Sequence, residues 1–220
     1  MRFGPLSLDE AEGAVLANSQ PAGGRRLKKG TVLGAEDIAA LKAEGFSEVL
    51  AARLDPDDMS EDAAAERLAQ ALVPDPKRAG LRLGRAATGR VNIHAEAPGV
   101  VEVLADRIHA LNAVDPMITV ATVPEWQRVG PRSMVATVKI ISYAVPAAAL
   151  EAACHAGQGA LRLRRVVHDT AKLIQTAVTA DESGDKGQAV TAERLDRLGV
   201  RLGEKQVVPH RIDALAEAIR

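Results

Sequence analysis

The order of strand and helix patterns near the end of the chain constrains its fold more than any other feature. Residues 171–176 form a short apolar run, and a polar loop over residues 179–187 follows it. Apolar residues at helical spacing then lead to Gly199, a residue type that commonly ends helices. Residues 200–208 have the pattern of a second strand, and residues 212–219 that of an amphipathic helix. This order predicts the beginning of an open, parallel α/β domain, which binds ligands at the carboxyl ends of several strands.

Two strands are too few to complete a domain of this kind. We therefore expect a domain that is cut short, with an incomplete ligand site and with parallel strands joined by a right-handed crossing. An apolar face should remain exposed on the helix over residues 212–219 or along Val207 and Val208. That face predicts either self-association into a homo-oligomer or a missing remainder that covers it.

Changes in composition divide the chain into predicted parts. Pro74 and Pro76 indicate a boundary or a stiff linker, and Gly157 and Gly159 end an alanine-rich segment and indicate a hinge. We predict the α/β fold class with an added β-rich module. The predicted parts are a small α+β N-terminal segment over residues 1–75, a β-rich module over 77–145, a helix and hinge over 146–160, and a partial open parallel α/β domain over 161–220.

Local patterns also predict individual elements outside the last part. Ser60 is a good N-cap for a helix that ends before Pro74. The sequence Glu-Ala-Pro-Gly at 96–99 predicts a hairpin turn between the strands on either side of it. The other predicted elements are helices over residues 36–44 and 106–111, and strands over 48–54, 91–95, 99–104, 118–123 and 134–141.

Composition disfavours several classes of protein. A formal net charge of −1 and an aromatic content of 2% argue against nucleic acid as the main partner. No run of about 18 apolar residues predicts a transmembrane helix, and the N-terminus lacks an apolar signal core. The single cysteine, Cys154, excludes an intramolecular disulfide and suits a reducing compartment. We therefore expect a cytoplasmic protein with neither a nucleic acid nor a membrane as its partner.

The polar loop contains the best chemical candidates, which are Ser183, Gly184, Asp185, Lys186 and Gly187. This loop joins a strand to a helix N-terminus, where backbone N–H groups favour anions. Lys186 could place a charge near a phosphate, and Asp185 could hold a hydroxyl group or a metal ion. In the alternative interpretation, Asp185 caps the helix and the two glycines only turn the chain. Thr176, at the end of the preceding strand, is a weaker candidate.

Other charged or reactive groups have simpler interpretations. The basic run of Arg25, Arg26, Lys28 and Lys29 could meet an anionic ligand or an acidic partner, although a solvated charge run is favoured. The acidic cluster over residues 55–62 fits a turn and a helix cap. The five histidines lack zinc-ligand spacing. Cys154 is interpreted as a small buried apolar residue, and Trp126 as an interface anchor or part of a satellite core.

Two sets of residues carry a family resemblance. Residues 173–176, 183–187, 193–200 and 212–218 are similar to the start of the molybdopterin-binding domain of molybdenum-cofactor biosynthesis proteins. Residues 30–45 and 48–53 resemble the segment that introduces a gate-like domain in molybdopterin molybdotransferases. The sequence also departs from this pattern. Thr176 is followed by Ala-Val-Thr-Ala-Asp-Glu instead of a Gly-Asp-Glu-Leu-type element, and no Ser-Gly-Gly-Thr-type loop follows a third strand.

The resemblance implies a molybdotransferase-like protein, or the N-terminal portion of one. The chemistry of that family inserts molybdate into the dithiolene of molybdopterin and needs a phosphate cradle and Mg²⁺. By resemblance, Thr176 and residues 183–187 would contact molybdopterin, and Asp185 would contact Mg²⁺. A binding or scaffold fragment fits the sequence better than a complete enzyme. The alternatives are a non-catalytic dimerisation or interaction module and a regulatory domain that senses a small anion.

Overall fold

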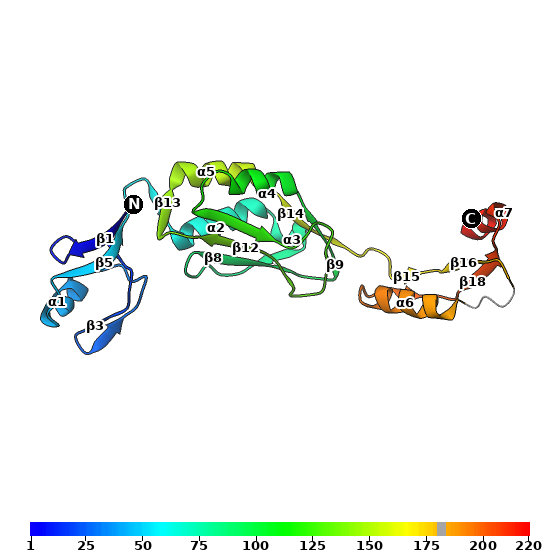
Figure 1. Ribbon diagram of the computed structural model, residues 1–220, viewed down its shortest axis with the longest axis horizontal. Coiled ribbons are helices and arrows are strands. Elements are labelled where there is room, and N and C mark those ends of the chain that lie inside the picture. Colours follow the sequence, from blue (N-terminus) through cyan, green and yellow to red (C-terminus); the bar gives the residue numbers. More distant parts are fainter. Residues whose placement is uncertain (180–183) are drawn as a thin grey trace.

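Helices and small sheets are mixed throughout the chain, which gives the α/β fold class that the sequence predicts. The computed structural model describes residues 1–179 and 184–220. In these residues seven helices accompany sheets that are mostly antiparallel. Figure 1 shows an N-terminal group of elements, a central group and a C-terminal group, which follow one another along the chain.

The N-terminal group has its own hydrophobic core. Strand β5 lies between β1 and β2 in a three-stranded antiparallel sheet. Ile38 and Leu41 of helix α1 are buried in this core, as their spacing predicts. Gly45 has a φ of 89°, so it ends α1 in a conformation that suits glycine. The elements are β1 (Arg2–Ser7), β2 (Val15–Leu16), β3 (Gln20–Ala22), β4 (Arg25–Leu27), α1 (Ala35–Ala43) and β5 (Glu48–Arg53).

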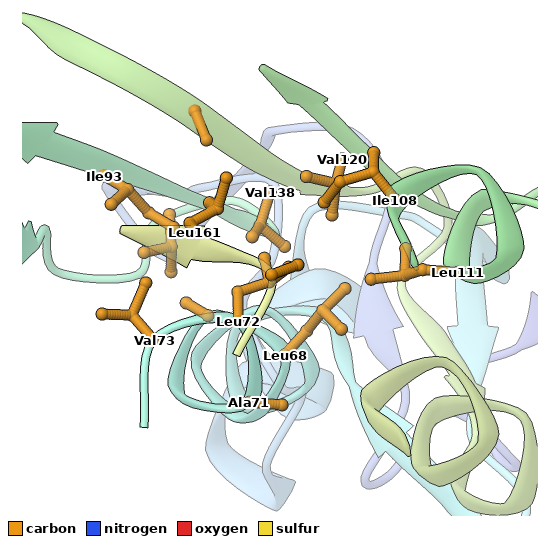
Figure 2. Packing of buried hydrophobic residues seen from close by; sticks show 14 of the residues in the cluster. Leu68, Ala71, Leu72, Val73, Ile93, Ile108, Leu111, Val120, Val138 and Leu161 are labelled. Atoms are coloured by element: carbon orange, nitrogen blue, oxygen red, sulfur yellow. The ribbon is translucent and has the colours of Figure 1, made fainter. Parts of the chain in front are cut away.

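The central group holds the larger core. Its two sheets have the strand orders β10-β12-β8-β7 and β11-β9-β14. Leu68 and Leu72 project from α2 toward Val138 of β12 and Leu161 of β14 (Figure 2). The elements are β6 (Asp58–Ser60), α2 (Glu61–Leu72), α3 (Pro76–Ala79), β7 (Leu81–Leu83), β8 (Arg90–Ala95), β9 (Gly99–Val103), α4 (Ala105–Asn112), β10 (Ile118–Thr122), β11 (Arg128–Val129), β12 (Met134–Ile140), β13 (Ala144–Pro146), α5 (Ala147–Ala156) and β14 (Leu161–Arg165).

Three features of the central group differ from the prediction. The predicted hairpin between residues 91–95 and 99–104 is wrong, because β8 pairs with β7 and β12 whereas β9 pairs with β11 and β14. Helix α2 packs on β8, β12 and α5, so the prolines at 74 and 76 do not separate it from the central core. Helix α5 and strand β14 share that core as well. The division into independent domains stays a prediction.

The C-terminal group pairs its strands in parallel, as predicted. Strand β15 pairs with β17, and β16 pairs with β18, with Ile174 opposite Gln206 and Thr176 opposite Val208. Helix α6 lies between β16 and β17 in the sequence, and α7 follows β18. The elements are β15 (Thr170–Ala171), β16 (Ile174–Ala177), α6 (Asp185–Asp196), β17 (Arg201–Leu202), β18 (Gln206–Pro209) and α7 (Ile212–Ile219).

Little apolar surface is buried in this group. Val200 is the one buried hydrophobic residue of the described stretch after Leu163. Ile212 is 90% exposed, Ile219 is 68% exposed and Val207 is 45% exposed. The exposed apolar face that the sequence predicts on α7 and along β18 is therefore confirmed. No helix of the described ranges has the length and apolar character to cross a membrane.

Candidate functional site

Two side chains meet at the carboxyl ends of the parallel strands β16 and β18. The Thr176 hydroxyl lies 2.9 Å from Nδ1 of His210, within hydrogen-bond distance. The His210 backbone N–H donates to the carbonyl oxygen of Ala177 at 2.9 Å, which continues the strand pairing by one residue. This is the edge at which open parallel sheets place their ligands. Thr176 therefore occupies the position that the sequence analysis gave it, beside a histidine that the analysis did not select.

His210 could have been found from its position alone. It directly follows Pro209, the last residue of the second strand, and the candidate Thr176 is the second-to-last residue of the first. Parallel pairing brings residues at such positions to one edge of a sheet. Metal-ligand spacing among the histidines carries no such signal, because His210 has no second histidine near it in the sequence. A threonine hydroxyl and an imidazole together can donate and accept hydrogen bonds at one point.

Helix α6 begins earlier than the predicted loop suggests. Gly184 is its N-cap, with a left-handed φ of 61°, so Asp185, Lys186 and Gly187 form its first turn and not a loop. The carbonyl oxygen of Gly184 accepts from the N–H of Gln188 at 3.1 Å. Ser183, the first of the predicted loop residues, lies outside the described residues. The helix N-terminus itself lies at Gly184, within the predicted segment.

The side chain of Asp185 is held by a lysine from another element. Lys205 Nζ lies 2.8 Å from Oδ1 of Asp185. The Lys205 side chain is only 13% exposed, whereas the Asp185 side chain is 77% exposed. The Lys205 ammonium is therefore largely shielded from solvent where it meets the first residue of α6. The N-cap position belongs to Gly184, so Asp185 does not occupy the cap position of the simpler interpretation. Its carboxylate at the first helical position is favourable in any case, because it faces the positive end of the helix dipole.

The first turn of α6 and its described surroundings contain two lysines and one aspartate. Lys186 is exposed in this turn, and Lys205 lies against Asp185. An alanine Cβ built at Gly187 would meet no atom within 4 Å, so this glycine lies against open space. The first N–H groups of a helix have no partner within the helix and point outward. This arrangement favours an anion such as a phosphate group near Gly184–Lys186.

A second helix N-terminus follows the strand edge. Arg211 caps α7, and its guanidinium forms an ion pair with Asp213 in the first turn. The hydrogen bond from Arg211 lowers the pKa of the Asp213 carboxyl below its ordinary value. The edge that holds Thr176 and His210 therefore continues into a charged, solvent-exposed helix start.

A complete metal site is not formed by the described residues. They contain no group of three His, Cys, Asp or Glu side chains arranged to hold an ion. Asp185, the residue predicted to contact Mg²⁺, already gives one oxygen to the ammonium of Lys205. A cation at Asp185 would face that positive charge. The present geometry therefore does not fit a magnesium ion held by Asp185 and its described neighbours.

The remaining sequence candidates are placed as follows. Cys154 is buried, and burial raises the pKa of its thiol to about 11, so it is not a reactive thiolate at neutral pH. Trp126 is exposed, with a φ of 60°. Arg25, from the basic run, pairs with Asp37 at 2.6 Å. In the acidic cluster, the backbone N–H of Asp55 donates to the Asp58 carboxylate at 2.8 Å, which is the predicted turn.

The N-terminal part of the chain matches a known family model. Residues 5–53 match the family model described as Domain of unknown function (DUF8806). This match coincides with the N-terminal hydrophobic cluster, which runs from Leu8 to Ala51. Among curated proteins, none matches the chain. The N-terminal group is thus similar to a family of domains of unknown function.

Proposed function

We propose that the C-terminal group binds molybdopterin, as part of a molybdotransferase-like protein of molybdenum-cofactor biosynthesis. The ligand class comes from the resemblance of residues 173–218 to molybdopterin-binding domains. The structural observation that supports it most is the start of α6 at Gly184, which follows a parallel strand and carries Lys186 in its first turn. Such a junction is suited to the phosphate of the ligand.

Each described candidate has a defined part in this proposal. The N–H groups of the first turn of α6 and the ammonium of Lys186 bind the phosphate. Lys205 adds positive charge and holds Asp185 at the start of α6. Thr176 and His210 present a hydroxyl and an imidazole at the strand edge, where a polar ring atom can bind. Molybdate is a substrate of the family's reaction, and no step that uses it is assigned to these residues.

One observation favours a second candidate, a dimerisation or interaction module. Ile212 and Ile219 of α7 are largely exposed, and an apolar helix face of this kind usually meets another surface. In this second candidate, α7 and the edge of β18 form an interface between copies of the chain. It does not exclude ligand binding, because Lys186 lies on α6 and not on α7.

Binding of molybdopterin by matched lysine variants tests the main proposal. Lys186→Ala should weaken binding by about 1–3 kcal/mol, the range for a hydrogen bond to a charged group. Lys172→Ala is the matched control, because Lys172 is an exposed lysine between β15 and β16. It should leave the affinity unchanged within about 0.5 kcal/mol. Calorimetric titration of the 220-residue chain with molybdopterin measures both. Equal loss in the two variants, or none in either, would contradict the proposal.

A further inference from the structure

A cavity of about 300 Å³ lies where the N-terminal group meets the central core. Its walls come from segments that are far apart in the sequence. Lys29 follows β4, Glu61 begins α2 and Lys139 lies in β12. The cavity is lined by Lys29, Glu61, Thr88, Lys139, Ile141, Ser142 and Tyr143. The volume is at the lower end of the range for small-molecule sites, about 300–1,000 Å³.

Tyr143 forms a fixed wall that joins the two groups. Its ring stacks on Phe3 with centroids 5.9 Å apart and planes inclined by 14°. Its hydroxyl donates to the carbonyl oxygen of Ala17 at 3.2 Å, and the ammonium of Lys29 lies 5.5 Å from the ring centroid. The backbone oxygen of Tyr143 accepts from the N–H of Glu61 at 2.9 Å. Tyr143 is therefore contacted by the ammonium of Lys29 through its ring and by the backbone of Glu61 through its carbonyl oxygen.

An unusual turn forms another wall of the cavity. Thr88 has a φ of 51° and Gly89 a φ of 70°, a left-handed conformation that is uncommon for a threonine. The carbonyl oxygen of Thr88 accepts from Lys139 Nζ at 2.5 Å. A Cβ at Gly89 would lie 2.9 Å from the Glu61 carboxylate, so this carboxylate packs directly on the turn. The turn thus positions Lys139 and Glu61 together.

Three charged groups line the cavity without pairing with one another. Among the described residues, the ammonium groups of Lys29 and Lys139 form no ion pair, and the Glu61 carboxylate forms neither an ion pair nor a hydrogen bond with a protein group. Glu61 is half-buried, and its pKa lies above the ordinary value, chiefly because burial disfavours the charged form. Of the three residues, Lys29 is exposed, whereas Lys139 and Glu61 are partly buried. A charged group that is partly removed from water is stabilised by a partner that replaces the lost hydration. A ligand with complementary charges would supply those partners.

We propose that this cavity binds a small metabolite that carries both an acidic group and an amino group. The acidic group lies between Lys29 and Lys139, and the amino group lies at Glu61. Because Lys29 belongs to the N-terminal group and the other two residues to the central core, the ligand bridges the two groups. This site is separate from the proposed molybdopterin site and does not depend on it.

Three small molecules test which charged groups of a ligand the cavity recognises. Phosphoethanolamine carries a phosphate and an amino group, β-alanine carries a carboxylate and an amino group, and inorganic phosphate carries an acidic group alone. Calorimetric titration of the full 220-residue chain should show that one of the two amino-bearing probes binds at least roughly tenfold more tightly than inorganic phosphate. The tighter of these two identifies the acidic group.

Substitutions then test the residues. Lys29→Gln should weaken the tighter probe at least roughly tenfold, whereas its neighbour Lys28→Gln, an exposed lysine outside the cavity lining, should change it less than about twofold. Glu61→Gln should weaken the amino-bearing probe and leave inorganic phosphate unchanged or tighter. Equal thermal unfolding of the three variants shows that they remain folded. The proposal is overturned if no probe binds, if Lys28→Gln acts like Lys29→Gln, or if Glu61→Gln weakens all probes alike.

Discussion

Replacement of Gly184 with alanine should destabilise the start of α6, and the same replacement at Gly187 should stabilise this helix. Gly184 has a left-handed φ of 61°, which costs an alanine about 1–2 kcal/mol. Its new Cβ would also lie 1.9 Å from the amide oxygen of Gln175, so that flexible side chain must move. Gly187 lies inside α6 with open space around it, and alanine there should add about 0.5–1 kcal/mol.

Native-state hydrogen exchange of the α6 amides measures this pair of variants. Helix α6 buries little apolar surface, so it should open locally at a lower free energy than the central core does. The two variants should differ by about 1.5–3 kcal/mol in the free energy of opening, or roughly 10–150-fold in exchange rate. Gly184→Ala should exchange faster than the unaltered chain and Gly187→Ala more slowly. Unchanged exchange in Gly184→Ala would refute the left-handed helix start on which the proposed phosphate site rests.

Three further predictions concern stability, titration and assembly. Leu72→Ala should lower the free energy of unfolding, measured in urea, by about 2–5 kcal/mol because Leu72 is fully buried. Leu104→Ala should lower it far less, because Leu104 is 38% exposed, and equal losses in the two variants would contradict the packing. The pKa of the Cys154 thiol rises from 9 to about 11 on folding, so the free energy of unfolding should fall as the pH rises from 9 toward 11. In chemical denaturation, Cys154→Ala should lack this part of the decline. Ile212→Glu should reduce self-association in light scattering, whereas Val167→Glu, at a residue that is 84% exposed and lies outside α7, should not. If the unaltered chain is a monomer at high concentration, the predicted self-association is wrong.

Local patterns in the sequence predict much of the secondary structure. Helix α1, strand β5 and helix α4 lie within a residue or two of their predicted ranges, because each depends on apolar spacing and end signals nearby in the chain. The parallel pairing of β16 with β18 follows from the strand–helix–strand order alone. None of these features depends on which segment far away in the sequence a strand pairs with or a helix packs against.

Features that depend on distant partners were not predictable in the same way. Strand β8 could have paired with β9 across a short turn, but β7 and β12 occupy both of its edges. The packing of α2 against α5 likewise depends on residues more than seventy positions apart, such as Arg67 and Glu151, which form an ion pair at 2.7 Å. Pro74 marks the end of a helix, and that signal carries no information about which core the helix joins.

The same distinction applies to the candidate site. The helix start near Gly184 follows from a local pattern of a strand, a polar loop and a helix. The contact of Asp185 with Lys205 depends on how β18 returns beside β16, and the contact of Thr176 with His210 depends on the register of these two strands. Sequence spacing gives candidate residue types, whereas the fold decides which of them share an edge.

Mapping the molybdopterin contact by NMR tests the central claim most directly. Amide chemical shifts of the 220-residue chain are recorded as molybdopterin is added. The account predicts that the largest changes fall on Gly184, Asp185 and Lys186 at the start of α6, with smaller changes at Thr176 and His210. Changes confined to the cavity lined by Lys29 and Glu61, or to no defined set of residues, would contradict a molybdopterin site on the C-terminal group.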